Sequence, residues 1–209
     1  MDIKTAIETG DGLALRSLLT DDPSGANRLI KWGKKCEIRT HPLHYVSDML
    51  FDGTLEPGKA VPLIDAIMSA GGDCNHQASN GETPLIGAAS LAAEDVGLRL
   101  LDAGARPDLR GAIKETALHW SAHLGLARLS ARLITEGSDV NLKDTRYNSS
   151  PLGWAIHGRF NSPPGSQGNH YDVVALLVAA GAAAEPKWLA DEQILADPRM
   201  LSALQRHRS

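Results

Sequence analysis

A repeated pair of sequence anchors limits what this chain can fold into. The first anchor is a Pro-Leu or Ala-Leu dipeptide followed by a helical apolar run, and the second is a glycine that closes a later apolar stretch. The two kinds of anchor alternate along the chain. The dipeptides are Pro42-Leu43, Pro84-Leu85, Ala117-Leu118 and Pro151-Leu152, and the glycines are Gly71, Gly104, Gly137 and Gly181.

The spacing between these anchors is regular. From a glycine to the next anchor leucine the distance is 14 residues twice and 15 once (71 to 85, 104 to 118, 137 to 152). From leucine to glycine it is 19 residues in the two middle repeats, against 28 and 29 in the outer two. The sequence therefore predicts a tandem array of helix pairs joined by turns, in which two repeats carry insertions of about ten residues.

Physical chemistry explains the residue types at the anchors. A single helix pair cannot bury its apolar face alone, so neighbouring pairs must stack into one continuous core. The Thr or Ser ahead of each Pro-Leu is expected to cap the first helix, and proline fits the first helical position because its missing N–H has no role there. Each glycine is expected to take the left-handed conformation that ends the second helix.

These motifs resemble the ankyrin-repeat family, whose unit of about 33 residues is a β-turn followed by two antiparallel helices. Residues 82–89 and 116–122 look like the family's opening turn and first helix, and residues 136–141 look like the end of its second helix. The clear motifs cover roughly residues 40 to 185. A helix pair of the same kind is expected at the N-terminus, and an amphipathic segment follows the repeats.

The resemblance implies an all-α fold, an ankyrin-repeat solenoid of about five helix-turn-helix repeats with short β-hairpin-like turns and a C-terminal capping helix. We expect a single ankyrin-repeat domain over residues 1–209. Its parts are repeats at about 1–39, 40–81, 82–114, 115–148 and 149–187, and a C-terminal cap at 188–209.

Charge and hydropathy exclude several classes of partner. The net charge of −4 and the isoelectric point near 6.0 give no basic footprint for nucleic acid or anionic lipid. No segment approaches the roughly 20 apolar residues that a membrane span needs, and the first residues do not look like a signal peptide. We therefore expect a cytoplasmic protein with no nucleic-acid and no membrane partner, in which Cys36 and Cys74 stay reduced.

The family resemblance implies that the hairpin tips and first helices line a concave groove in which a protein partner binds. The positions two residues after the anchor leucines form one column of this face, and three of them are aromatic, a type enriched at interface hot spots. We expect a monomer that binds a protein partner of unknown identity. The candidate partner-binding residues are Tyr45, Asp48, Gln77, Asn80, Arg110, Glu115, Trp120, His123, Lys143, Arg146, Tyr147, Trp154, His157 and Phe160.

Structural interpretations of the same residues stay open. Trp120 and Trp154 also suit packing of one repeat on the next, and the charged hairpin residues also suit a solvated edge. The two insertions, 51–59 and 159–168, are rich in Gly, Pro and Ser and are predicted to be loops. They either carry function or reflect drift, since long surface loops affect stability little.

Signatures of catalysis are missing, so we predict no enzyme activity and no cofactor. The chain has no phosphate-binding loop, dinucleotide fingerprint, nucleophile elbow or zinc-protease motif. Two groups have metal-like composition: the pair His119 and His123, and a set whose spacing fits no zinc module. The resemblance implies a structural hydrogen-bonding role for His119, so we expect no metal. The second set is Cys36, His41, His44, Cys74 and His76.

Two other functions remain as alternatives to partner binding. An enzyme could use a groove site made of Asp48, His123 and His157, but one such side chain per repeat predicts separations of roughly 10 Å, too long for direct hydrogen bonds. The chain could also be a structural or self-assembling spacer. Because repeat scaffolds are interchangeable while their exposed positions vary, the sequence does not identify the partner.

Overall fold

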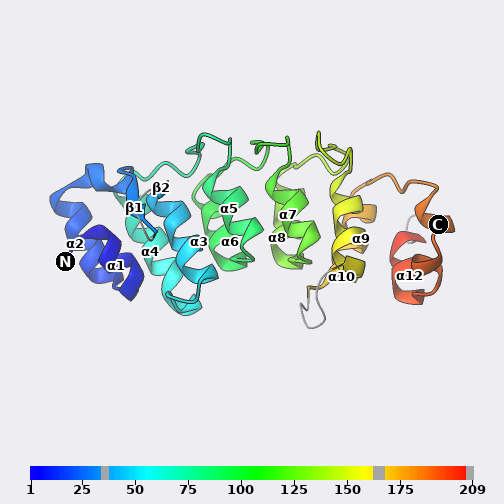
Figure 1. The fold of residues 1–209 in the computed structure, drawn as a ribbon, viewed down its shortest axis with the longest axis horizontal. Helices are drawn as coiled ribbons and strands as arrows, with labels where there is room; N and C mark the ends of the chain where they lie inside the picture. The colour runs from blue at the N-terminus through cyan, green and yellow to red at the C-terminus, as the bar shows by residue number, and fades with distance from the viewer. Residues whose placement is uncertain (34–37, 162–167, 206–209) are drawn as a thin grey trace. The chain divides into compact units, whose positions relative to one another are not determined.

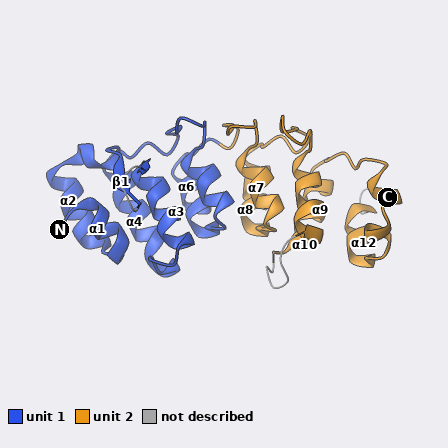
Figure 2. Ribbon diagram, viewed as in Figure 1, with its two compact units in different colours: residues 1–106 blue, residues 107–209 orange. Residues whose placement is uncertain are grey.

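The computed structural model describes residues 1–33, 38–161 and 168–205. The chain divides into two compact units, residues 1–106 and residues 107–209 (Figure 2). In each unit the helix pairs stand side by side, and the long connecting turns lie at one end of the pairs, the top in Figure 1.

The described part of unit 1 consists of helix pairs and a small β-hairpin. First helices pack on first helices, α1 on α3 and α3 on α5, and second helices pack on second helices, α2 on α4 and α4 on α6. The helices are α1 (Ile3–Thr9), α2 (Gly12–Asp21), α3 (Pro42–Phe51), α4 (Pro57–Ser69), α5 (Pro84–Ser90) and α6 (Glu94–Asp102). The 3-10 helix η1 (Pro23–Ala26) and the antiparallel strands β1 (Ile30–Trp32) and β2 (Ile38–Thr40) follow α2.

The described part of unit 2 repeats this arrangement. Helix α7 packs on α9 and α8 packs on α10, which in turn contacts α12. The elements are α7 (Ala117–His123), α8 (Ala127–Thr135), α9 (Pro151–Asn161), α10 (His170–Ala179), η2 (Trp188–Ala190), α11 (Glu192–Leu195) and α12 (Pro198–Gln205).

The anchor leucines occupy equivalent places at the start of the first helices. Leu43, Leu85, Leu118 and Leu152 are each the second residue of their helix, and their side chains are at most 1% exposed. The second helices add their own buried faces, so apolar side chains fill the space between adjacent pairs in each unit. The prediction of an all-α repeat fold is confirmed.

The anchor glycines and the start of α5 follow the predicted chemistry, whereas the start of α3 differs. The four anchor glycines have φ between +83° and +90°, the left-handed conformation expected at these positions. The Thr83 hydroxyl accepts a hydrogen bond from the Ile86 N–H at 3.2 Å, as an N-cap should. Helix α3 differs, because His41 precedes Pro42 and its imidazole Nδ1 accepts from the Leu43 N–H instead.

Asparagine side chains connect successive turns, a feature that the sequence analysis did not predict. The Asn27 amide donates to the Gly71 carbonyl at 2.9 Å and accepts from the Asp73 N–H at 2.7 Å. Asn141 repeats this pattern with Gly181 and Ala183, at 3.0 and 2.8 Å. These residues satisfy backbone groups just past the glycine that ends the next second helix.

The predicted insertion loops are helical at their ends, where the flanking helices extend into them. Phe51 ends α3 and Pro57 begins α4, so only residues 52–56 separate the two helices. Proline is favourable at the first position of α4, and Leu55 in the connection is buried at 2% exposure. In the second insertion, residues 159–161 belong to α9, and residues 162–167 lie outside the described residues.

Two further differences lie near the ends of the chain. The short hairpin of β1 and β2 was not predicted, because two strands of three residues leave little pattern to detect. The described part of the C-terminal cap, up to residue 205, is three short helical segments, since Asp191 caps the start of α11 and Pro198 begins α12. In the part of the chain that the structure describes, no helix is long and apolar enough to cross a membrane.

Candidate protein-binding surface

The candidate residues of unit 1 come from α3 and from the turn between α4 and α5. Tyr45 points into the core, where its hydroxyl donates to Glu8 Oε1 at 2.7 Å and its ring packs edge-on against Trp32. Its side chain is 1% exposed, so the expectation that Tyr45 contacts a partner directly is wrong. It is buried because the turn of α3 that follows Leu43 faces the N-terminal helix pair.

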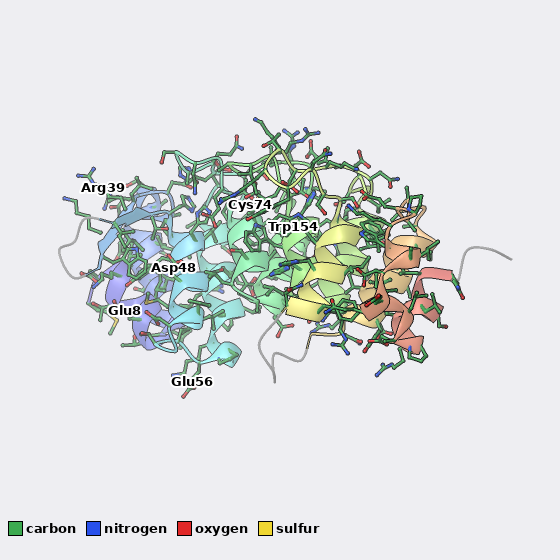
Figure 3. All side chains as sticks on the ribbon, turned by 45° about the vertical axis from the view of Figure 1, so that its right-hand side comes forward. Glu8, Arg39, Asp48, Glu56, Cys74 and Trp154 are labelled. Atoms are coloured by element: carbon green, nitrogen blue, oxygen red, sulfur yellow. The ribbon has the colours of Figure 1, made fainter. Side chains whose placement is uncertain are left out.

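Asp48 lies one turn further along α3 and is half-buried (Figure 3). Burial raises the pKa of its carboxyl to about 6, and the nearby carboxylates of Glu82 and Asp52 act in the same direction. Gln77 and Asn80 are exposed in the turn ahead of α5. Unit 1 therefore presents polar and acidic groups on this face.

The candidate residues of unit 2 include a continuous cluster of rings. The Trp120 and Trp154 rings meet at right angles with centroids 5.0 Å apart, and the Tyr147 ring lies 6.1 Å from that of Trp154. His123 contacts both tryptophans and stacks on His157 at 5.7 Å. We call these five side chains, Trp120, His123, Tyr147, Trp154 and His157, the ring cluster.

Close contact between two first helices brings the cluster together. Gly158 of α9 faces the carbonyl oxygen of His123 on α7, and a Cβ atom at this glycine would collide with that oxygen. The imidazole Nε2 of His170 lies 2.8 Å from the same carbonyl oxygen. The expected separation of roughly 10 Å is thus wrong for His123 and His157, because α7 and α9 approach more closely than the repeat spacing suggested.

Asp144, a residue that the sequence analysis did not select, fixes the cluster in place. Its carboxylate accepts hydrogen bonds from the backbone N–H groups of Arg146, Tyr147 and Ser149 at 2.8, 2.6 and 3.2 Å, and from the Trp154 indole N–H at 3.0 Å. Burial alone would raise the pKa of Asp144, but these donors hold it below its ordinary value. The carboxylate therefore joins the turn ahead of α9 to the tryptophan on that helix.

The members of the cluster differ in exposure. Tyr147 is 62% exposed and His157 is exposed, whereas Trp120 and His123 are half-buried. Trp154 is only 8% exposed and packs against the rings of Trp120, His123 and Tyr147, which agrees with the packing interpretation and not with direct contact to a partner. Burial lowers the pKa of His123, and the neighbouring His157 and His170 lower it further.

The remaining candidates surround this cluster in different ways. Arg146 lies over the Tyr147 ring, with its guanidinium carbon 5.5 Å from the ring centroid, and Lys143 pairs with Glu185 at 3.0 Å. Arg110 is exposed, and Phe160 is half-buried under the guanidinium of Arg159. Glu115 is 8% exposed and accepts from the Ile113 N–H, so its predicted contact with a partner is wrong.

His119 has the structural role that the resemblance implied. Its Nδ1 accepts from the Thr116 N–H at 3.1 Å, and its Nε2 lies 3.1 Å from the Leu142 carbonyl oxygen, which joins two successive turns. Both ring nitrogens are thereby used within the fold. Cys36, one member of the second metal-like set, lies outside the described residues, and those residues contain no group of three or more His, Cys, Asp or Glu side chains arranged to hold a metal ion.

The histidine pair has little of the arrangement that a catalytic base needs. A general-base histidine is commonly oriented by a carboxylate on its second nitrogen. In the described structure, His157 Nδ1 instead lies 3.2 Å from the amide nitrogen of Asn161, and His123 faces other rings. The geometry therefore suits contact with a ligand better than proton transfer.

The chain was compared with models of known protein families and with curated proteins. The family model of the ankyrin repeat matches residues 114–145, from the turn ahead of α7 to the turn after α8. No curated protein matches the chain. Together with the helix pairs of both units, the match confirms the resemblance to the ankyrin-repeat family, and the chain carries an ankyrin repeat at these residues.

Proposed function

We propose that this chain is a protein–protein interaction module, an adaptor or an inhibitor, and that the ring cluster of unit 2 is the centre of its binding surface. Ankyrin repeats generally serve as such modules. The observation that carries the proposal is the combination of exposed Tyr147 and His157 with half-buried Trp120 and His123, on two adjoining helices and the turn ahead of α9. Tryptophan and tyrosine dominate interface hot spots because they contribute large contact areas.

The cluster is also held in a fixed geometry before any partner arrives. Asp144 fixes the turn that carries Tyr147, and it also binds the indole of Trp154, on which the other rings pack. Side chains that are ordered in advance lose less conformational entropy on binding. This preorganisation supports an interface role over that of a merely solvated edge.

The proposal needs neither a catalytic step nor a cofactor, and it takes the chain to be a cytoplasmic monomer. Within unit 2, the residues Arg110, Lys143 and Arg146 would widen the contact area, and Gln77 and Asn80 stay predicted contacts of unit 1. These residues are exposed, and their contribution would be that of a polar rim.

The test compares capture of partners by the wild-type chain and by the double variant Trp120→Ala, Tyr147→Ala. Proteins retained from a native lysate are identified by mass spectrometry, produced separately and titrated against both chains. Leu13→Ala is the matched control, since Leu13 is an 83% exposed apolar side chain on α2. We expect the double variant to bind a purified partner at least ten-fold more weakly and the control to bind it normally.

The double variant must first be shown to fold, by a circular dichroism spectrum and a melting curve close to those of the wild type. A purified partner that binds the double variant with unchanged affinity would contradict the proposal. Equal weakening by Leu13→Ala would also contradict it, because the effect would then not belong to the ring cluster.

A further inference from the structure

The first helices of unit 2 have an uneven set of charged groups. Helices α7 and α9 contain no Asp or Glu, while they contribute His123 and His157 to the ring cluster. Arg146 adds a guanidinium over the exposed ring of Tyr147. The surface therefore presents N–H donors and positive charge beside aromatic rings.

Two carboxylates in the turns ahead of α7 and α9 are turned inward. Asp144 is 2% exposed and is occupied by four N–H donors, and Glu115 is 8% exposed and binds the turn at Ile113. Neither can neutralise an exposed cation without giving up its internal hydrogen bonds. The donors of the ring cluster thus lack a carboxylate partner on their own helices.

The tautomer of His157 directs one of these donors outward. The Asn161 amide nitrogen lies 3.2 Å from His157 Nδ1, and an amide nitrogen can only donate. The proton of the neutral imidazole is then on Nε2. His157 is exposed, so this N–H is available to an acceptor on a partner.

We propose that the ring cluster binds an acidic segment of the protein partner, in which Asp or Glu side chains flank an aromatic or apolar anchor. The inference rests on the proposed function and specifies the chemistry of the partner. The anchor would pack on Trp120 and Tyr147, while carboxylates accept hydrogen bonds from the His157 N–H and the Arg146 guanidinium. A basic segment is disfavoured because like charges would face each other across the contact.

Three labelled peptides of one length test this chemistry with the full chain. The first places four glutamates around a central tryptophan, the second replaces them with glutamines of the same shape, and the third with lysines. Affinities are measured by fluorescence anisotropy at neutral pH. We expect the glutamate peptide to bind at least ten-fold more tightly than the glutamine peptide, and the lysine peptide to bind most weakly.

A double variant identifies the groups responsible. Arg146→Gln with His157→Gln should bring the affinity of the glutamate peptide down to that of the glutamine peptide, which itself should change little. Lys31→Gln is the control, because it removes an exposed cation from strand β1 of unit 1. General unfolding would weaken the binding of both peptides, so a loss of affinity for the glutamate peptide alone would not be explained by it.

The outcomes separate this inference from the proposed function. Equal binding of the glutamate and glutamine peptides, tighter binding of the lysine peptide, or binding of no peptide overturns the acidic-segment inference. The proposed function is judged independently, by the effect of Trp120→Ala with Tyr147→Ala on a purified partner. A partner that depends on these rings but does not bind through an acidic segment would leave the function standing and the inference refuted.

Discussion

Asp144 lies in the turn between α8 and α9, and its carboxylate binds both the backbone of that turn and the side chain of Trp154 on α9. Four N–H donors converge on its buried carboxylate. A hydrogen bond to a charged group contributes about 1.5–3 kcal/mol, and a buried donor without a partner is unfavourable. The conformation of the turn and the orientation of Trp154 therefore depend on this one side chain.

We predict that Asp144→Ala lowers the free energy of unfolding by roughly 3 kcal/mol, because it leaves several N–H groups without an acceptor. Urea unfolding followed by tryptophan fluorescence measures the change. Asp139→Ala is the control, since Asp139 is exposed and accepts one N–H bond, from Asn141 at 2.9 Å. Similar losses of unfolding free energy in the two variants would show that the four hydrogen bonds of Asp144 stabilise the fold no more than the single bond of Asp139.

Gly104 offers a test of backbone conformation at a single residue. Its φ is +90°, and a Cβ atom there would meet nothing within 4 Å, so a substitution acts through the backbone and not through a clash. Gly104→Val should lower the free energy of unfolding by about 1 kcal/mol or more. Gly58→Ala in α4, also without a neighbour for its Cβ, should leave stability unchanged or raise it. A melting temperature of Gly104→Val equal to or above that of the wild type would contradict the assignment of Gly104 as the left-handed glycine after α6.

At the scale of elements, the asparagine bridges join one turn to the end of the next second helix. Asn141 bridges to the backbone of Gly181 and Ala183 in unit 2. Its amide provides both a donor and an acceptor, which aspartate or leucine at this position could not. The bridge fixes the turn after α8 against the turn after α10.

We predict that Asn141→Ala destabilises the chain by about 1–2 kcal/mol, the effect of two lost hydrogen bonds. Hydrogen exchange should show faster opening at the amide of Ala183, which loses its acceptor. Asn161→Ala is the control, because within the described residues the Asn161 side chain bonds to His157, one turn earlier in the same helix α9. Unchanged exchange at Ala183 would show that the bridge is not a stabilising contact.

At the scale of the molecule, the sensitivity of the fold to acid follows from its buried histidines. Burial lowers the pKa of both His41 and His44 to about 4. The unfolded chain, with histidine pKa values near 6.5, then binds more protons than the folded chain between about pH 6.5 and 4. The contribution of these two histidines to stability is therefore complete above about pH 6.5. As the pH falls toward 4, the free energy of unfolding decreases by up to about 1.4 kcal/mol per pH unit for each histidine.

Asp48 acts in the opposite sense and provides the variant for the test. Its folded pKa of about 6 lies above the ordinary 3.8, so its ionised form is unfavourable in the fold at high pH. Asp48→Asn should raise stability at pH 8 by about 1 kcal/mol, a value reduced for solvent screening of this half-buried group, and the gain should vanish toward pH 4. In the wild type, protonation of Asp48 partly compensates for the stability that the buried histidines lose as the pH falls. Asp48→Asn lacks this compensation, so its free energy of unfolding should fall more steeply on acidification.

Urea unfolding midpoints of the wild type and of Asp48→Asn, measured from pH 8 to pH 4, check the predicted pH dependence of the histidines and of Asp48. Asp21→Asn is the control, since Asp21 is an exposed carboxylate at the end of α2. A wild-type chain that gains stability between pH 6.5 and 5 would refute the role of the histidines. A gain from Asp48→Asn that is the same at every pH would refute the role of the carboxylate.

The sequence predicted the elements better than the site. The anchors located the helix pairs and the left-handed glycines, because helix termini depend on local backbone chemistry. The extent of the first insertion loop was overestimated, since proline and glycine near a helix start resemble loop composition. Asp144 was missed because an aspartate in a turn looks like many others until its four donors are in place.

The sequence by itself determined the periodic helix pairs and the burial of Leu43, Leu85, Leu118 and Leu152, since both follow from short-range periodicity and apolar residue type. The tertiary structure alone decided which polar and aromatic side chains face solvent. Tyr45 and Trp154 are buried whereas Tyr147 is exposed, although all were equivalent candidates. Exposure is set by packing between residues far apart in the chain, and no local pattern encodes the approach of α7 to α9.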